Sequence, residues 1–189
     1  RGQFATKNRE LGNYFKVCST CGYVQPDFSN IKEQNKWHFN ADGYKCYGEL
    51  YNCYLGHHFT SDALVIQLPI NKDQELNEYE SILYAIIEGA SIKMEIDRRE
   101  IGGSIWRNGK SSSINITLFD TVPNGAGHVK RMISEIKGIL KEALNKVSGQ
   151  CGCGEETCCY GCLRNYANQQ YHDTMSRGNA KKYLEWLLR

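Results

Sequence analysis

The chain has 189 residues and a formal net charge of +2, with 41% hydrophobic and 23% charged residues. This length suits one domain of ordinary size with room for a small appended module, and the composition is that of a globular protein. No apolar run approaches the ~20 residues of a membrane span and no targeting segment is evident, so we expect no membrane partner and a cytoplasmic location. The net charge is too small to indicate nucleic-acid binding by itself. Because the first residue is Arg1 rather than Met, we expect a fragment of a longer protein.

The first cysteine pair, Cys18 and Cys21, lies in a C-x-x-C-G turn of the kind that supplies half of a zinc site. The other half must come from downstream. His38 with Cys46 gives a Cys₃His site, Cys46 with Cys53 gives a Cys₄ site, and the spacing is compatible with either. The intervening segment is polar and aromatic without apolar periodicity, so it needs a metal to become ordered. The alternative is a pair of buried free cysteines beside a surface histidine.

Apolar periodicity begins after this region. Residues 64–68 alternate as in a strand, and His57 and His58 stand at its entrance. Adjacent strand residues point to opposite faces, so we do not expect this histidine pair to share a metal. A core-packing helix over 74–96 follows, and then two strands at 101–107 and 114–120 joined by an Asn-Gly turn.

A glycine-rich segment then connects Asp120 to a long helix that begins near His128 and ends near Ser148-Gly149. Free N–H groups at a helix start can bind an anion, but no P-loop motif is present, so the chain has no evident ATP site. Asp120 and His128 would be the acid/base or metal groups of a hydrolase acting on a nucleotide or phosphodiester. The alternative is a tight turn in which Asp120 accepts backbone N–H donors.

Residues 151–162, CGCGEETCCYGC, hold five of the nine cysteines. The spacing pairs Cys151 with Cys153 and Cys159 with Cys162, which gives four thiolates for a structural Zn²⁺ ion. Cys158 is left over, because its step to Cys162 fits a knuckle less well. A disulfide framework is the alternative, but the cysteine total is odd and no signal peptide is visible.

A last amphipathic helix covers roughly 177–188. Together these elements predict an α+β fold, with a small mixed or antiparallel sheet packed against two or three helices and two zinc-binding cysteine clusters. The helix over 128–146 carries six basic or histidine residues against two glutamates, so it is a candidate contact face for phosphates or simply a solvated face.

The motifs FDTVPNGAGHVKRM and CGCGEETCCYGCLRNYANQQYHDTMSRGNAKKYL resemble the zinc-binding domain at the C-terminus of superfamily 2 DNA helicases of the mitomycin repair factor A type. A related domain occurs in the DISARM antiphage protein DrmB. The upstream C-x-x-CGY, H-x4-G-x2-C and LGHHFTSD stretches resemble the region before that domain. The resemblance thus covers nearly the whole chain from Cys18, most specifically in the terminal motif.

The resemblance selects Cys151, Cys153, Cys159 and Cys162 as ligands, places Cys158 in a small-residue slot and favours His38 with Cys46 upstream. It also implies Asn124-Gly125 where the family has a glycine pair, a turn that Asn tolerates. We therefore expect a zinc-knuckle region at 1–56 and an α+β helicase-associated domain at 57–189, which together form one compact unit.

By this resemblance we expect a zinc-stabilised accessory module of antiviral defence or DNA repair that contributes to DNA binding or to partner docking, with Zn²⁺ as cofactor and DNA as partner. The helicase motor would lie upstream in the same protein or in a partner subunit, so we do not assign enzymatic activity to the fragment. The expected DNA contacts, acting mainly on phosphates, are Lys130, Arg131, Arg164, Asn165 and Arg177.

Overall fold

A computed structural model describes residues 2–7, 15–26, 37–53, 56–70, 78–107 and 113–189. The chain divides into two compact units. We call Phe4–His58 the N-terminal unit, and Arg1–Gln3 with Phe59–Arg189 the C-terminal unit. Strands β1 (Gly2–Lys7) and β7 (Gly56–Ser61) pair as a two-stranded sheet, and the division between the units falls within both strands.

Besides its part of the β1–β7 pair, the described residues of the N-terminal unit form two small sheets. Strand β2 (Phe15–Cys18) lies between β3 (Val24–Pro26) and β6 (Leu50–Cys53), and all pairings are antiparallel. Strands β4 (His38–Phe39) and β5 (Lys45–Cys46) form a short hairpin that pairs His38 with Cys46. Among the described residues of this unit only Cys18 is buried, with 2% of its surface exposed. The described part of the unit therefore has almost no hydrophobic core.

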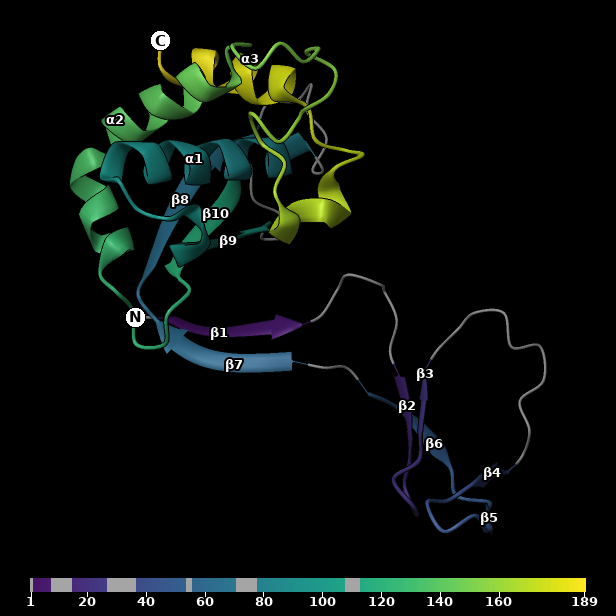
Figure 1. Cartoon of the computed structure of the whole chain (residues 1–189). Helices are drawn as coiled ribbons and strands as arrows, with labels where there is room; N and C mark the ends of the chain where they lie inside the picture. The colour runs from purple at the N-terminus through teal and green to yellow at the C-terminus, as the bar shows by residue number, and fades with distance from the viewer. Residues whose placement is uncertain (1, 8–14, 27–36, 54–55, 71–77, 108–112) are drawn as a thin grey trace. The chain divides into compact units, whose positions relative to one another are not determined.

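The C-terminal unit has a three-stranded antiparallel sheet in the order β8 (Ala63–Pro69), β10 (Ser113–Asp120), β9 (Ile101–Trp106). Three helices complete the unit: α1 (Tyr79–Met94), α2 (His128–Val147) and α3 (Arg177–Leu187) (Figure 1). Two short 3₁₀ helices are η2 (Arg98–Glu100) and η3 (Tyr166–Tyr171). The predicted α+β class, with small antiparallel sheets and helices, is confirmed.

Helix α1 is the centre of this unit and contacts strand β9, α2 and α3. The sequence predicts one apolar stripe, but α1 is buried on nearly every side, including Ser81 and Glu88, because other elements cover it. Gly89 permits the close crossing with α2, since a Cβ atom there would lie 2.4 Å from the Ile139 carbonyl oxygen. The core contains Ile86 and Met132, both fully buried.

Two details differ from the sequence expectations, and two predicted segments lie partly outside the described residues. His57 and His58 lie within a separate strand, β7, rather than at the entrance to β8. Ile133 fits the apolar period of α2 but is 63% exposed, whereas Ile139 is fully buried. The start of the predicted helix, 74–77, and most of the predicted turn, 108–112, lie outside the described residues.

Candidate metal centres

The first centre combines two turns of the N-terminal unit. Its four candidate ligands, Cys18, Cys21, His38 and Cys46, have their ligating atoms within 4.8 Å of one another. The Cys18 and Cys46 sulfurs are 3.8 Å apart, and Cys21 Sγ lies 3.1 Å from His38 Nε2. A tetrahedral zinc ion with bonds of about 2.3 Å to sulfur requires S···S edges of about 3.8 Å. The donor set and its size therefore fit Zn²⁺.

Backbone N–H groups donate to the sulfurs of this centre and favour their thiolate form. The N–H groups of Thr20 and Cys21 donate to Cys18 Sγ at 3.3 and 3.5 Å, and Gly48 N–H donates to Cys46 Sγ at 3.4 Å. Desolvation opposes ionisation of the Cys18 thiol, but these N–H donors and the neighbouring thiols outweigh it and lower the pKa of Cys18 to about 6. A thiolate is the form that binds zinc.

Two residues beside this centre were not singled out from the sequence. Gly48 has no room for a side chain, because a Cβ atom there would lie 2.5 Å from Cys18 Sγ. The Tyr23 ring stacks on the ligand ring of His38, with centroids 4.7 Å apart and planes at 17°. Such a contact fixes the orientation of an imidazole ligand. The recurring Cys-Tyr-Gly sequence, at Cys46-Tyr47-Gly48 and at Cys159-Tyr160-Gly161, was the available signal for Gly48.

The second centre lies in the loop that follows α2. Cys151, Cys153, Cys159 and Cys162 place all four sulfurs within 4.8 Å of one another. Three edges measure 3.5 Å (151–153), 3.8 Å (153–162) and 3.9 Å (159–162). These distances again match the tetrahedral edge of about 3.8 Å. Desolvation raises the pKa of Cys162, whereas the backbone N–H of Cys153, first among several hydrogen-bond donors, lowers the pKa of Cys151 to about 7.

The remaining two cysteines lie outside both clusters. Cys158 is 3% exposed and packs in the core with Leu163 and Met175, while Cys53 ends strand β6. None of the nine cysteines, all of which lie in the described residues, forms a disulfide. Both predicted ligand sets are thus brought together, and the two leftover thiols are not.

Arg177 connects the second centre to the helices. Its Nε donates to the Cys153 carbonyl at 2.9 Å and its Nη1 to the Val147 carbonyl at 3.3 Å. The first N–H groups of α3, at Arg177 and Gly178, donate to the Thr157 and Glu155 carbonyls at 2.9 Å each. The metal loop therefore supplies the acceptors that satisfy the start of α3.

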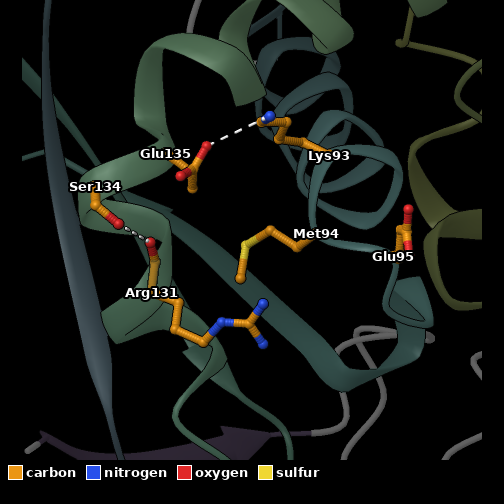
Figure 2. Close-up of a pocket in the computed structure, with 6 residues that line it drawn as sticks. All are labelled: Lys93, Met94, Glu95, Arg131, Ser134 and Glu135. Atoms are coloured by element: carbon orange, nitrogen blue, oxygen red, sulfur yellow. Dashed lines mark hydrogen bonds and ion pairs between the residues drawn. The ribbon is translucent and has the colours of Figure 1, made fainter.

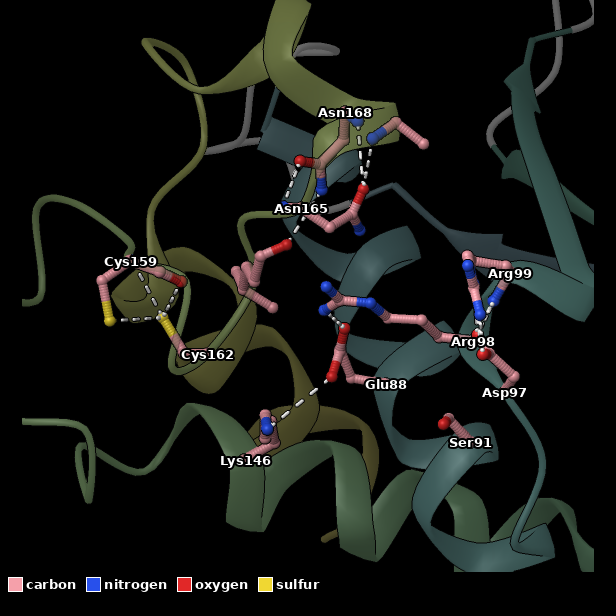
Figure 3. A network of polar contacts seen from close by, with 12 residues as sticks. Glu88, Ser91, Asp97, Arg98, Arg99, Lys146, Cys159, Cys162, Asn165 and Asn168 are labelled. Atoms are coloured by element: carbon pink, nitrogen blue, oxygen red, sulfur yellow. Dashed lines mark hydrogen bonds and ion pairs between the residues drawn. The ribbon is translucent and has the colours of Figure 1, made fainter.

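A buried carboxylate on α1 is paired with cations of two other elements (Figure 3). Glu88 on α1, with only 8% of its side chain exposed, accepts a bond of 2.6 Å from Arg98 Nη1 and lies 3.7 Å from Lys146 Nζ. These pairs join α1, η2 and the end of α2. A buried charge must be paired in this way, so Glu88 is a structural residue that the helical pattern alone did not reveal.

In the structure the five predicted DNA contacts differ from one another in exposure and in hydrogen bonding. Lys130 and Arg131 are exposed on the first turn of α2, with Lys130 Nζ 3.1 Å from Asp62 Oδ2. Arg164 is half-buried and donates to the His172 carbonyl at 3.2 Å. The Asn165 side chain caps η3 by accepting from the N–H groups of residues 167 and 168. Arg177 is 8% exposed and is engaged as described above.

The glycine-rich loop forms a tight turn. Asp120 is fully buried, and its carboxylate accepts from Gly127 N–H at 2.7 Å and Val129 N–H at 3.1 Å. His128 Nε2 lies 3.0 Å from Glu100. Asn124 and Gly125 take φ values of 69° and 81°, the left-handed turn expected of them. Asp120 thus occupies the anion position at the start of α2, and the hydrolase interpretation is not favoured.

Fold and site together define a zinc-binding α+β domain, and comparisons with known proteins agree. Residues 82–163 match the family described as the MrfA Zn-binding domain, which confirms the resemblance and zinc as the cofactor. The chain is similar to the Druantia protein DruE of Escherichia coli (strain UMEA 4076-1), with 26% identity over 96% of this chain and 11% of that protein.

Among solved structures the chain is similar to the DUF1998 helicase MrfA bound to DNA, with a TM-score of 0.51 and 14% identity. That similarity covers 87% of this chain and 20% of the helicase chain. The chain therefore spans about a tenth of the curated relative and a fifth of the structural one. No helix among the described residues is long and apolar enough to cross a membrane.

Proposed function

We propose that the chain is a zinc-stabilised accessory domain that contacts DNA and assists a helicase motor. We place this motor in the same protein or in a partner subunit. We assign the whole assembly to a cytoplasmic antiviral defence or DNA repair system. The family match and the DNA bound to the helicase of similar fold support this proposal. So does the similarity to DruE, a protein of the Druantia system. We further propose that the predicted regions 1–56 and 57–189 have different tasks in it.

The exposed face of α2 is the observation that carries the proposal. Lys130, Lys137 and Lys141 are exposed at intervals of seven and four residues, so they lie along one side of the helix. At 1.5 Å per residue this row is about 16 Å long. Within the described residues neither Lys137 nor Lys141 has an ion-pair partner. Lys130 is paired with Asp62, so the two unpaired cations of this row, Lys137 and Lys141, are the ones best suited to a phosphate backbone.

A pocket at the end of α1 holds two cations, Lys93 and Arg131, and two carboxylates, Glu95 and Glu135 (Figure 2). Arg131 and Ser134 of α2 line it opposite Lys93 and Met94 of α1. Lys93 is partly neutralised by Glu135, 3.5 Å away, whereas Arg131 is exposed. Arg131 is therefore the cation of this pocket that we assign to a phosphate. Arg164 is a further candidate, although one of its Nη groups already donates to the His172 carbonyl. The side chains of Asn165 and Arg177 each make two internal hydrogen bonds, and we assign them positioning roles.

Charge reversal tests the proposal. Lys137→Glu with Lys141→Glu should weaken duplex DNA binding and lower the slope of log K against log salt by about 2, since each phosphate contact contributes about 0.9. The matched control is Lys182→Glu with Arg189→Glu, the same charge change at two exposed residues near the other end of the unit's sequence. An unchanged affinity and slope in the first pair, or an equal loss in the control, would exclude α2 as the contact.

A further inference from the structure

The three-stranded sheet of the C-terminal unit ends at β9, and no described strand pairs with the outer side of β9 (Figure 1). On its inner side β9 pairs with β10 residue for residue, without a bulge. At the end of β10, Asp120 N–H donates to the Asp62 carbonyl beside β8 at 3.3 Å. The next N–H, of Thr121, donates to the Glu100 carbonyl beside β9 at 3.0 Å. Because bonding partners alternate along antiparallel strands, the even-numbered residues of β9 bond to β10 and the odd-numbered residues point away from it.

Three residues of β9 therefore turn their backbone groups to the outer side: Ile101, Gly103 and Ile105. The Ile101 N–H is already bound to the Arg98 carbonyl. The Ile101 carbonyl and both backbone groups of Gly103 and Ile105 have no backbone partner among the described residues. These groups repeat about every 6.8 Å, a spacing that the donors and acceptors of another extended backbone match. The edge therefore suits an extended polypeptide strand, whereas a nucleic acid has no such row of alternating groups.

The opposite edge of the sheet, β8, is protected where β9 is not. Pro69 has no N–H, and its carbonyl accepts from the Tyr183 hydroxyl at 2.9 Å. Helix α2 also contacts β8. Strand β9 contains neither a proline nor a charged residue, and it has no bulge. Proteins normally close an exposed edge with one of these devices, so an edge that lacks them indicates a strand partner.

The side chains around β9 define the kind of strand. Ile105 packs against the hydrophobic core, so alternate side chains of an added strand would extend that core and must be apolar. Two exposed arginines stand at the ends of β9: Arg107, and Arg99, which pairs with Asp97 but has a side chain that is 85% exposed. They favour acidic residues at the ends of the partner strand. A second copy of β9 suits this edge less, because two-fold pairing centred on Gly103 would oppose Arg107 to Arg99 of the other copy.

We propose that the outer edge of β9 binds an extended, alternately apolar polypeptide strand with acidic ends, which joins the sheet as a fourth strand. The matched region is about a tenth of DruE and a fifth of the MrfA chain, so proteins of this kind have other segments that can supply such a strand. This docking edge goes beyond the proposed function and does not depend on the lysines of α2.

The test uses the whole zinc-loaded chain and the peptide ESINITLFD, which copies residues 113–120 behind an added glutamate. This peptide has the alternation of β10, the strand that β9 already accepts on its inner side, and it has acidic ends. By nuclear magnetic resonance, hydrogen exchange at the N–H groups of Gly103 and Ile105 should be fast in the free chain. Saturation with the peptide should slow it by at least about 10-fold. The matched control peptide is N-methylated at its two isoleucines and its leucine, whose N–H groups would face β9, and it should cause no slowing.

Two variants locate the contact on β9. Ile105→Pro removes an outward N–H without removing a bond to β10, so peptide binding should weaken by at least about 10-fold while the Thr117 N–H stays protected. If the Thr117 N–H loses protection in this variant, the comparison of the two peptides decides. Arg107→Glu should weaken binding by about 3-fold, and replacing the leading glutamate of the peptide by lysine should restore it.

Four results would overturn the proposal. The first is slow exchange at Gly103 and Ile105 in the free chain at every concentration, which would show that the edge is already covered. The second is protection that appears only as the chain concentration rises, which would make a second copy the occupant. The third is equal slowing by the methylated peptide, and the fourth is no slowing by the parent peptide at about 1 mM. None of them affects the α2 test, because that test uses duplex DNA and different residues.

Discussion

The two zinc centres of this chain have similar ligand geometry and opposite surroundings. The C-terminal centre adjoins a hydrophobic cluster that includes Cys162, Leu163 and Leu184, all fully buried. The N-terminal centre has around it no buried hydrophobic residue other than Cys18 among the described residues. At the C-terminal centre the metal fixes a loop on an existing core, whereas at the N-terminal centre the metal takes the place of a core.

This difference explains why the aromatic residues of the N-terminal unit are exposed. Rings that would form a core in a metal-free domain are released for the surface when zinc supplies the folding free energy. In the C-terminal unit the apolar side chains are used by the sheet and helices, and the exposed residues on α2 are mainly charged. The chemistry offered to a partner therefore differs between the units.

The largest predicted effect is loss of one ligand in each centre. Cys46→Ser should remove hydrogen-exchange protection throughout 15–26 and 37–53 and leave α1 protected, because the described part of the N-terminal unit has almost no hydrophobic core to support its short sheets without the metal. Cys159→Ser should expose 151–172 and loosen α3 while the sheet and α1 persist. Exchange measured by mass spectrometry checks both variants, each of which should keep one zinc. Collapse of α1 in Cys159→Ser would contradict the contrast between the units.

Shortening a core side chain of the C-terminal unit tests whether the N-terminal unit depends on that core. Ile86→Ala removes a fully buried side chain of α1 and should lower the free energy of unfolding of the C-terminal unit by about 2–5 kcal/mol. The N-terminal unit should keep its zinc and its exchange protection. Denaturant titration with a zinc release assay measures both quantities, and the exposed Ile92→Ala is the matched control. Simultaneous loss of zinc from the N-terminal centre would show that the units depend on one core.

Replacing the connection between metal loop and helix should have a moderate effect. Arg177→Lys cannot reach the Cys153 and Val147 carbonyls together, and the lost charge-assisted bonds should cost about 1.5–3 kcal/mol. The same variant should raise exchange at the start of α3 without releasing zinc. The control variant is Lys182→Glu, which reverses the charge of an exposed residue on the same helix. If DNA affinity falls while stability is unchanged, Arg177 is a contact rather than a positioning residue.

The sequence predicted best where a chemical pattern or a period determined the outcome. The spacing of Cys151, Cys153, Cys159 and Cys162 indicated one ligand set, and the alternation over residues 64–68 indicated the strand that is β8. The role of Arg177 was hidden, because a basic residue beside a knuckle suits a phosphate as well as a carbonyl. The two roles of Arg177, phosphate contact and carbonyl donor, are distinguished only by its burial. That burial depends on carbonyl groups 24 and 30 positions earlier in the chain.

Tertiary contacts explain the other differences. The all-round burial of α1 depends on three partners distant in sequence, which a single-helix period cannot report. Ile133 satisfied the apolar period of α2 but faces away from both α1 and the sheet, so it is exposed. At the N-terminal centre the choice between His38 and Cys53 was left open by spacing, because pairing of β4 with β5 decides which side chain faces the thiols.

The smallest predicted effect concerns the extra cysteine of the second centre. Cys158→Ala should keep two zinc ions per chain and reduce stability by about 1 kcal/mol, because Cys158 packs as a small apolar side chain in the core. Its neighbour gives the matched control, since Cys159→Ala should lose one zinc. Elemental analysis of both variants after dialysis is sufficient. The opposite result, in which Cys158→Ala loses zinc and Cys159→Ala keeps it, would make Cys158 the zinc ligand and Cys159 the core thiol. The distinction between the two cysteines would then be wrong.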